Sequence, residues 1–343
     1  MEEHRALEWR PPSTWEHLTV IESHAGGEPF RVVVDGLPDI PGDTVLDRRR
    51  YAEENLDPLR RRLMWEPRGH SDMYGGWLGP PTTSEGDLSV LFLHNEGFST
   101  MCGHGIIALS KVVIDTGMVP ASQPETTLRI ETPAGLVEAT SSVFDGRVVS
   151  TRFRNVPSFV SGLDLEVFVE TIGQVRFDLA FGGAFYAIVD ATSLDLDLDD
   201  SLALITRGRE IKQAIVASRD IRHPEDDDLG FLYGVIFTGP PLDPSSHSRN
   251  VCVFADGEID RSPTGTGVSA RLAILHARGE VAAGRDIIVE SITGSRFGGR
   301  IVEVLDGDPE RVIPEISGSA HLIGRAEMWF DPVDELGEGF FLR

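Results

Sequence analysis

The sequence predicts an α/β fold built as two similar halves, and three observations support this prediction. The chain has 343 residues, which is more than one domain of ordinary size usually contains. Many segments have the pattern of β-strands, and a smaller number of helical segments lie between them along the chain. The same order of strand, glycine-rich turn and apolar helix also occurs twice, in residues 101–119 and 260–280.

The two turns match position by position. Cys102 in MCGHG lies 162 residues before Thr264 in SPTGTG, and the helix-ending glycines Gly117 and Gly279 are separated by the same distance. Duplication of one half is the simplest explanation, because chance matching of glycine-rich turns would not reproduce the order of elements. Two similar halves usually place a ligand between them, so we expect the functional site where the two turns face each other.

The first half is predicted to cover residues 17–156, after an N-terminal extension at 1–16. Two β segments joined through a glycine pair occupy its start, and arginine and glutamate at helical spacing predict a solvated helix over 44–63. Residues 67–81 are rich in glycine and proline, which predicts a loop and a candidate lid. A buried strand, the helix after Cys102 and two strand regions follow, at 88–97, 105–116, 127–139 and 147–155.

The second half is predicted to cover residues 157–314 and to repeat this series. Its GGAFYAIVD echoes GGEPFRVVVD of the first half. Strands are expected at 175–191, 231–240 and 249–259, and helices at 201–221 and 267–278. The final segment, 315–343, has strand-like alternation and is expected to pack back on the first half.

Composition and charge exclude several classes of function. The formal net charge of −24 repels nucleic acid and anionic membranes, and no apolar run approaches membrane-spanning length. Two cysteines give no disulfide framework, and the acidic N-terminus lacks the pattern of a secretory signal, so we expect a cytoplasmic protein. No nucleotide-binding glycine motif occurs, and no organic cofactor is expected.

The two turns have the features of an anion site with a base beside it. The first N–H groups of a helix lack partners and carry partial positive charge, and glycines at 103, 105, 265 and 267 would let a carboxylate approach them. The pKa of the Cys102 thiol, about 8.5 in free peptides, is expected to fall at such a helix start. A thiolate beside Cα of an amino or imino acid can remove the α-proton, and the helix starts then stabilise the developing charge.

Other interpretations of these residues stay open. Thr264 could be an ordinary N-cap, and Asp260 a plain turn residue ahead of Ser-Pro. His104 could hydrogen-bond a substrate or cap its turn, but with Cys102 it lacks a third ligand at zinc spacing, so no metal site is predicted. Cys252, in the alternating strand RNVCVFADG, has the pattern of a small buried hydrophobic residue.

Taken together, MCGHG, DRSPTGTGVSA, SHAGGEPFRVV and PRGHSDMYG resemble the proline racemase family, and most closely its trans-3-hydroxy-L-proline dehydratases. The resemblance runs from about Leu18 to the C-terminal FFLR and includes FLHNEG, GGAFYA and FLYG. It implies a fold like that of diaminopimelate epimerase, in which each half has a mostly antiparallel sheet curled around a central helix.

The resemblance also implies a role for each residue of the two turns. Cys102 would be the proton acceptor, and Asp260 would bind the substrate's imino nitrogen, which suits a charge-assisted pair. The other substrate contacts would come from Gly103, His104, Gly265 and Thr266.

Racemases of this family carry cysteine in both turns, so Thr264 predicts a different reaction. A hydroxyl is a far weaker acid than a thiol and cannot alternate between base and acid roles near neutral pH. Removal of the α-proton by one base remains possible, and loss of a 3-hydroxyl gives the carbanion an exit. We therefore expect dehydration of trans-3-hydroxy-L-proline to Δ1-pyrroline-2-carboxylate, with the Cys102 thiol protonating the leaving oxygen in a syn elimination.

Two alternatives stay open. A proline racemase or 4-hydroxyproline 2-epimerase would need a second base in place of Thr264, whereas a non-catalytic imino-acid binding protein would not need the thiol of Cys102. The expected partner is a small-molecule substrate, with no nucleic acid, no membrane and no metal. The sequence does not fix the oligomeric state, for which we expect a homodimer.

Overall fold

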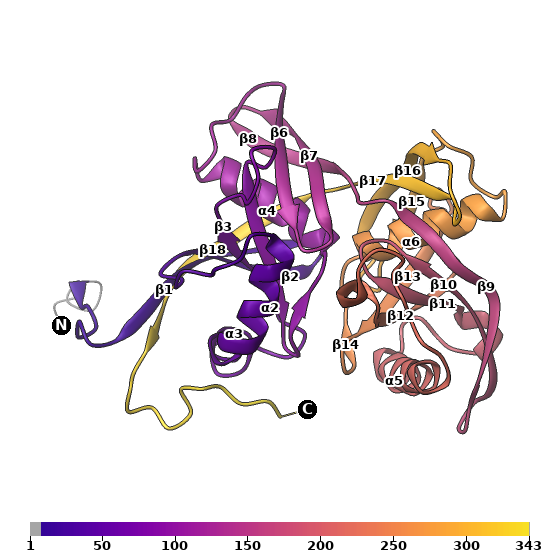
Figure 1. Ribbon diagram of the computed structural model, residues 1–343, viewed down its shortest axis with the longest axis horizontal. Coiled ribbons are helices and arrows are strands. Elements are labelled where there is room, and N and C mark those ends of the chain that lie inside the picture. Colours follow the sequence, from indigo (N-terminus) through magenta and orange to yellow (C-terminus); the bar gives the residue numbers. More distant parts are fainter. Residues whose placement is uncertain (1–7, 343) are drawn as a thin grey trace.

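A computed structural model describes residues 8–342, which form two β-rich halves side by side (Figure 1). Residues 1–7 of the predicted N-terminal extension lie outside the described residues. In the rest of the extension, the Trp9 ring packs against Trp15 and Trp329, with ring centroids 6.2 and 5.0 Å away. No helix within residues 8–342 is long and apolar enough to cross a membrane.

One sheet makes up the first half. Its strands are β1 (Glu16–Ala25), β2 (Glu28–Asp35), β3 (Tyr74–Gly79), β4 (Leu88–His94), β5 (Phe98–Ser99), β6 (Glu125–Thr132), β7 (Gly135–Phe144), β8 (Arg147–Arg154) and the late strand β18 (Ala320–Phe330). They are hydrogen-bonded in the order β18–β1–β2–β3–β4–β6–β7–β8, with the short β5 against β4. Only β2–β3 and β4–β6 among these pairs are parallel.

The second half repeats that arrangement. Its strands are β9 (Ser158–Val169), β10 (Gly173–Phe181), β11 (Phe185–Asp190), β12 (Leu232–Gly239), β13 (Ser248–Phe254), β14 (Glu258–Ile259), β15 (Ile287–Glu290), β16 (Arg296–Leu305) and β17 (Arg311–Gly318). Their order is β9–β10–β11–β12–β13–β15–β16–β17, with β14 against β13 and with β11–β12 and β13–β15 parallel. The parallel pairs therefore occupy the same places in both halves.

Each half encloses one apolar helix and carries further helices outside. The inner helices α4 (Gly103–Asp115) and α6 (Gly265–Ala277) are equally long and almost entirely buried, as expected for helices that are apolar on all sides. They contact strands of their own sheets, and one core cluster of buried side chains runs through both halves. Outside lie α2 (Val45–Asn55), α3 (Asp57–Met64) and α5 (Ser201–Ser218), with 3-10 turns at Ala191–Leu194 and Asp227–Leu229.

Strand β17 connects the halves through its pairings, and β18 returns the chain to the first half. β17 pairs with β16 and β9 of the second half and also with β8 of the first. β18 then runs antiparallel to β1, so that Ala320 lies opposite Ala25 and Phe330 opposite Glu16. The end of the chain therefore lies on the first half, although the division into 17–156 and 157–314 stays a prediction.

The predicted single helix over 44–63 is wrong, because it is two helices separated at Leu56. Pro58 lies in the first turn of the second helix, where its missing N–H costs no helical hydrogen bond. Nor is this region solvated throughout, since Arg60 is buried and donates to the carbonyl oxygens of His94 and Asn95.

The predicted loop over 67–81 is also partly wrong, because Tyr74–Gly79 form a strand between β2 and β4. Glycine is used here for close packing: a Cβ on Gly76 would lie 2.8 Å from the Phe30 ring. A strand held on both sides by neighbouring strands cannot serve as a lid, so the lid prediction fails for this segment.

Candidate functional site

The two glycine turns meet at the interface between the halves. A Cβ on Gly103 would lie 2.6 Å from the Cα of Gly265, so the N-termini of α4 and α6 are in backbone contact. Beside this contact is a cavity of about 20 Å³, room for about one water. It is lined by Tyr74, Met101, Cys102, Gly103, His104, Tyr186, Tyr233, Cys252, Phe254, Asp260, Thr264, Gly265 and Thr266. The structure thus brings all seven residues predicted for the site together.

Cys102 occupies the N-cap position of α4 with an extended backbone. Its Sγ accepts a hydrogen bond from the Gly105 N–H at 3.2 Å and lies 3.3 Å from Nδ1 of His104. Glycine at 105 is required by the crowding around this sulfur, because a Cβ there would lie 2.7 Å from the Phe30 ring and 2.9 Å from Sγ. The start of the helix therefore directs the Gly105 N–H at the sulfur, which is a contact that would stabilise a thiolate anion.

Burial nevertheless raises the pKa of the Cys102 thiol well above its ordinary value. The carboxylates of Asp260 and Glu28 raise it further, while the Gly105 N–H and the Tyr74 hydroxyl act in the opposite direction. The predicted fall of this pKa at the helix start is therefore wrong for the closed cavity. The thiolate needs a positive charge nearby to form, and a cationic ligand nitrogen beside Asp260 would supply one.

His104 is held neutral at this site. Burial lowers the pKa of its imidazole to about 4, although the nearby Asp260 carboxylate opposes this shift. The ring stands edge-on to Tyr74 and Phe30, with centroid distances of 4.9 and 5.8 Å. A neutral imidazole locked in this way can hydrogen-bond a thiol or a ligand, but it does not supply the missing positive charge.

Thr264 occupies the matching N-cap position of α6 but does not cap the helix. Its backbone is left-handed, with φ 65°, a conformation that is uncommon for a residue with a Cβ. Instead of turning toward the helix N–H groups, its hydroxyl donates to Oδ2 of Asp260 at 2.8 Å. The N-cap interpretation of the Thr264 side chain is therefore wrong.

Asp260 is a buried carboxylate held in a fixed orientation. Its Oδ1 accepts the Ser262 N–H at 2.7 Å, and its own N–H donates to the Cys252 carbonyl at 3.0 Å. The residue is thus part of a turn ahead of Ser-Pro, as the alternative interpretation held, and also faces the cavity. A buried anion in this place suits a cationic nitrogen.

A second set of charges beside Asp260 joins the halves and could not be recognised from the sequence. Oε2 of Glu28, on β2, accepts the backbone N–H of Arg261 at 2.7 Å, and the Arg261 guanidinium lies 2.9 Å from Asp72. Burial raises the pKa of Glu28 well above its ordinary value, and the carboxylate of Asp260 raises it further. Glu28 and Asp72 belong to the first half and Arg261 to the second, so this contact fastens the closed arrangement.

Three tyrosines complete the cavity wall, and the sequence analysis missed them. The Tyr74 hydroxyl lies 3.0 Å from that of Tyr233 and also hydrogen-bonds Ser99, while the Tyr186 hydroxyl lies 2.6 Å from Oγ1 of Thr266. Burial raises the pKa of each of the three phenols well above its ordinary value, so all three are neutral. Their motifs, PRGHSDMYG, GGAFYA and FLYG, were the available signal.

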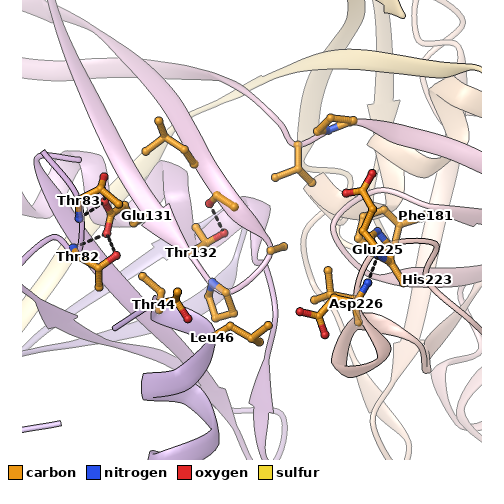
Figure 2. Close-up of a pocket in the computed structure, with 18 of the residues that line it drawn as sticks. Thr44, Leu46, Thr82, Thr83, Glu131, Thr132, Phe181, His223, Glu225 and Asp226 are labelled. Carbon is orange, nitrogen blue, oxygen red and sulfur yellow. Dashed lines mark hydrogen bonds between the residues drawn. The ribbon is translucent and has the colours of Figure 1, made fainter. Parts of the chain in front are cut away.

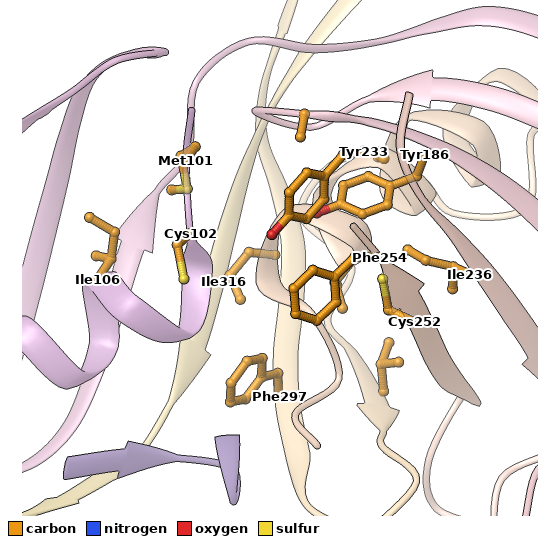
Figure 3. Packing of buried hydrophobic residues seen from close by; sticks show 14 of the residues in the cluster. Met101, Cys102, Ile106, Tyr186, Tyr233, Ile236, Cys252, Phe254, Phe297 and Ile316 are labelled. Carbon is orange, nitrogen blue, oxygen red and sulfur yellow. The ribbon is translucent and has the colours of Figure 1, made fainter. Parts of the chain in front are cut away.

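The second cysteine lies on the other side of the same cavity. Figure 3 shows Cys102 at the start of α4 and Cys252 on its strand beside Ile236 and Phe254. Cys252 is fully buried in the common core, as its alternating strand predicted, and burial raises the pKa of its thiol. It has the environment of a core side chain that also reaches the cavity wall.

A larger cleft of about 470 Å³ lies between the halves, away from the two turns (Figure 2). None of the predicted site residues lines it. The Glu131 carboxylate in this cleft accepts hydrogen bonds from the N–H and the hydroxyl group of both Thr82 and Thr83. The centroid of the His223 ring lies 4.7 Å from that of the Phe181 ring. The reactive side chains are therefore at the smaller cavity. Within residues 8–342, no group of three or more His, Cys, Asp or Glu side chains is placed to hold a metal ion.

Comparison with known proteins gives consistent matches over nearly the whole chain. The family model for proline racemase matches residues 20–341. A trans-3-hydroxy-L-proline dehydratase of Burkholderia ambifaria is 46% identical, and a 3-hydroxyproline 2-epimerase of Burkholderia multivorans is 45% identical, each over 95% of this chain and 98% of the relative. The crystal structure of a hydroxyproline epimerase from Agrobacterium vitis, with bound trans-4-hydroxy-L-proline, superposes with a TM-score of 0.92 at 34% identity and covers 96% of both chains.

Proposed function

Because the chain belongs to the proline racemase family, as its turn motifs predicted, we propose that it dehydrates trans-3-hydroxy-L-proline to Δ1-pyrroline-2-carboxylate without an organic cofactor. The observation that carries the proposal is the unequal pair of side chains across the cavity. Cys102 presents a thiol, whereas Thr264 presents a hydroxyl whose proton is donated to Asp260. The name of the Burkholderia ambifaria relative supports the same reaction.

We propose that the substrate bridges the two helix starts. The carboxylate would accept hydrogen bonds from the N–H groups of Gly103, His104, Gly265 and Thr266, because the first N–H groups of a helix have no partner within it. The imino nitrogen, positively charged at neutral pH, would pair with Asp260. These two contacts would hold Cα between Cys102 and Thr264.

Proton removal would then be the task of Cys102. A cationic nitrogen paired with Asp260 cancels one of the charges that raise the pKa of the thiol, so substrate binding favours the thiolate. The thiolate takes the α-proton, and the helix N–H groups stabilise the charge that spreads onto the carboxylate. Because the substrate supplies the positive charge, the Cys102 thiolate forms when the substrate is bound.

The carbanion would decay by elimination. Its electron pair forms the double bond between C2 and C3 as the bond from C3 to oxygen breaks, and the oxygen leaves as water after gaining a proton. The resulting enamine tautomerises to Δ1-pyrroline-2-carboxylate. Return of a proton to the opposite face of Cα is disfavoured, because the Thr264 hydroxyl is a weak acid whose proton is already donated to Asp260.

Epimerisation is the second candidate, and the name of the Burkholderia multivorans relative favours it. It requires a proton donor on the Thr264 side of Cα. Cys252 lines the cavity there, but it lies within strand β13 and does not have the helix-start position that Cys102 has. Dehydration requires only the Cys102 side and is therefore the better supported reaction.

Three substrates distinguish the candidates. The protein is incubated with trans-3-hydroxy-L-proline, L-proline and trans-4-hydroxy-L-proline, and products are analysed for pyrroline and for D-configured or epimerised imino acid. We expect pyrroline from the first substrate and neither product from the others. Epimer without pyrroline would overturn the proposal in favour of the second candidate, and binding without turnover of any substrate would indicate a binding protein.

We further propose a cytoplasmic homodimer. The acidic composition and the cysteine content support the compartment. Light scattering should give twice the chain mass of 37.5 kDa, and a mass of one chain would exclude the dimer.

A further inference from the structure

We propose that Tyr74 is the acid that protonates the leaving 3-hydroxyl. Cys102 then gives Tyr74 the proton that it has taken from Cα, so that the phenol is restored. This inference rests on the proposed dehydration and adds a catalytic residue to it. It replaces direct transfer from the thiol to the leaving oxygen by transfer through one phenol.

The contacts of Tyr74 hold its hydroxyl at the cavity that Cys102 also lines. Both residues line this space, which has room for about one water, and the Tyr74 hydroxyl hydrogen-bonds the Ser99 hydroxyl and lies 3.0 Å from the Tyr233 hydroxyl. Tyr74 is only 3% exposed and lines the cavity. Its ring is fixed edge-on against His104 at 4.9 Å. A donor with one defined position therefore lies at the same small cavity as the group that receives the α-proton.

The stereochemistry of the substrate favours the same residue. In the trans isomer the α-hydrogen and the 3-hydroxyl lie on one face of the ring, so the base and the acid must act from that face. Cys102 and Tyr74 both belong to the first half, whereas Thr264 and Asp260 belong to the second and face the opposite side of Cα. The acid is therefore expected among first-half side chains.

The other hydroxyls that line the cavity belong to the second half. The Thr264 hydroxyl donates to Asp260, and that of Tyr186 is paired with Thr266 at the start of α6. Tyr233 comes from the second half, and Figure 3 shows its hydroxyl turned toward the side of Cys102, where it reaches Tyr74. Tyr233 and Ser99 are thus placed to support Tyr74 by donating hydrogen bonds to its oxygen as negative charge develops there.

The proton balance of the step closes without any further reactant. The Tyr74 hydroxyl gives its proton to the C3 oxygen as the bond from C3 to oxygen breaks, which releases water. The thiol of Cys102, carrying the former α-proton, gives that proton to the Tyr74 oxygen. The phenol and the thiolate are both regenerated, so the site is ready for the next substrate. Burial raises the pKa of Tyr74, which keeps the phenol protonated before the step and disfavours a lasting phenolate after it.

The test compares two leaving groups in Tyr74→Phe. Elimination of hydroxide from trans-3-hydroxy-L-proline needs an acid, whereas elimination of chloride from trans-3-chloro-L-proline does not. We expect the variant to lose about 10²-fold or more in kcat with the hydroxy substrate and to stay within about fivefold of the wild type with the chloro substrate. Retained chloride elimination also demonstrates that the variant is folded and that Cys102 still removes the α-proton.

Tyr186→Phe is the matched control, because it deletes a second buried phenol hydroxyl at the same cavity but on the Thr266 side. Its effect should be equal on both substrates, leaving the ratio of the two rates unchanged. Two results for Tyr74→Phe would overturn the inference. Equal losses on both substrates would indicate a structural role for Tyr74. Full activity on the hydroxy substrate would indicate that Cys102 transfers the proton directly. A wild-type protein that eliminates chloride but not hydroxide would instead refute the proposed dehydration, and the inference with it.

Discussion

The turns at Cys102 and Thr264 start from the same local sequence pattern and end in different geometries. Both precede inner helices of equal length that terminate at a left-handed glycine, Gly117 or Gly279. Cys102 has an extended backbone and turns its side chain back to the N–H of its own helix, whereas Thr264 is left-handed and turns its side chain away, to Asp260. One turn thus holds a candidate base, and the other holds the anion that would bind the substrate. The difference shows how a repeated element can take two geometries through a change in one residue and its backbone angle.

Removing the thiol should have the largest effect on this pair. Cys102→Ala deletes the only proposed base, so we expect kcat for pyrroline formation to fall by about 10³-fold or more. The matched control is Cys252→Ala, which removes the other buried thiol and should retain most of the turnover. Comparable losses in the two variants would remove the distinction between the turns on which the proposed function rests.

Changing the other turn should have a smaller effect of a different kind. Thr264→Val deletes the hydrogen bond to the Asp260 carboxylate, and a bond to a charged group contributes about 1.5 to 3 kcal/mol, so kcat/KM should fall by about tenfold to a hundredfold. Thr264→Cys should instead gain exchange of the α-proton and some epimerisation of trans-4-hydroxy-L-proline, measured by NMR in D₂O. A Thr264→Val variant without activity would indicate that Thr264 acts in the chemistry itself.

The pH dependence should report the raised pKa of Cys102. Because the thiolate is the active form, kcat/KM should rise about tenfold per pH unit on the acidic side, and its plateau should lie above the ordinary thiol value of about 8.5. His104, with a pKa of about 4, should give no inflection between pH 5 and 8. A plateau that is already reached at pH 7 would mean that the helix start outweighs burial in the free enzyme.

The contact between the two helix starts should affect stability more modestly. Gly103→Ala places a Cβ 2.6 Å from the Gly265 backbone, and overpacking of this kind costs about 1 to 3 kcal/mol, offset by up to about 1 kcal/mol of better helix propensity. The measurement is the free energy of unfolding in urea. Gly97→Ala is the control, since a Cβ there meets no atom within 4 Å and should change little. An equally stable Gly103→Ala would mean that the helix starts can separate without penalty.

The family and the mixed α/β fold were predictable because their signals are local. MCGHG and DRSPTGTG are contiguous, and the apolar helix after each turn has an unambiguous period. Both predictions are confirmed by the family match and by the superposition on the Agrobacterium vitis structure. The roles predicted for the turn residues stay predictions, although the structure brings those residues to one cavity.

What the sequence could not predict depends on contacts between distant segments. The strand at Tyr74–Gly79 has the glycine content of a loop. Its glycines are required because neighbouring side chains such as Phe30 leave no room for a Cβ. The left-handed backbone of Thr264, whose hydroxyl bonds Asp260, is uncommon for a β-branched residue, so no local pattern indicates it. The pKa of Cys102 was predicted in the wrong direction because a helix start is visible in the sequence, whereas burial and the carboxylate of Glu28 are not.

The chain passes between the two halves twice, once from β8 to β9 and once from β17 to β18 (Figure 1). A cavity of about 20 Å³ cannot admit a five-membered ring with its carboxylate, so the halves have to part before a substrate enters. These crossovers are the two covalent tethers about which they would swing, and both lie beside the β8–β17 pairing. A protease that cut between β8 and β9 would leave the two halves held together by the pairing of β18 with β1, whereas shortening one tether would slow every cycle of admission and release.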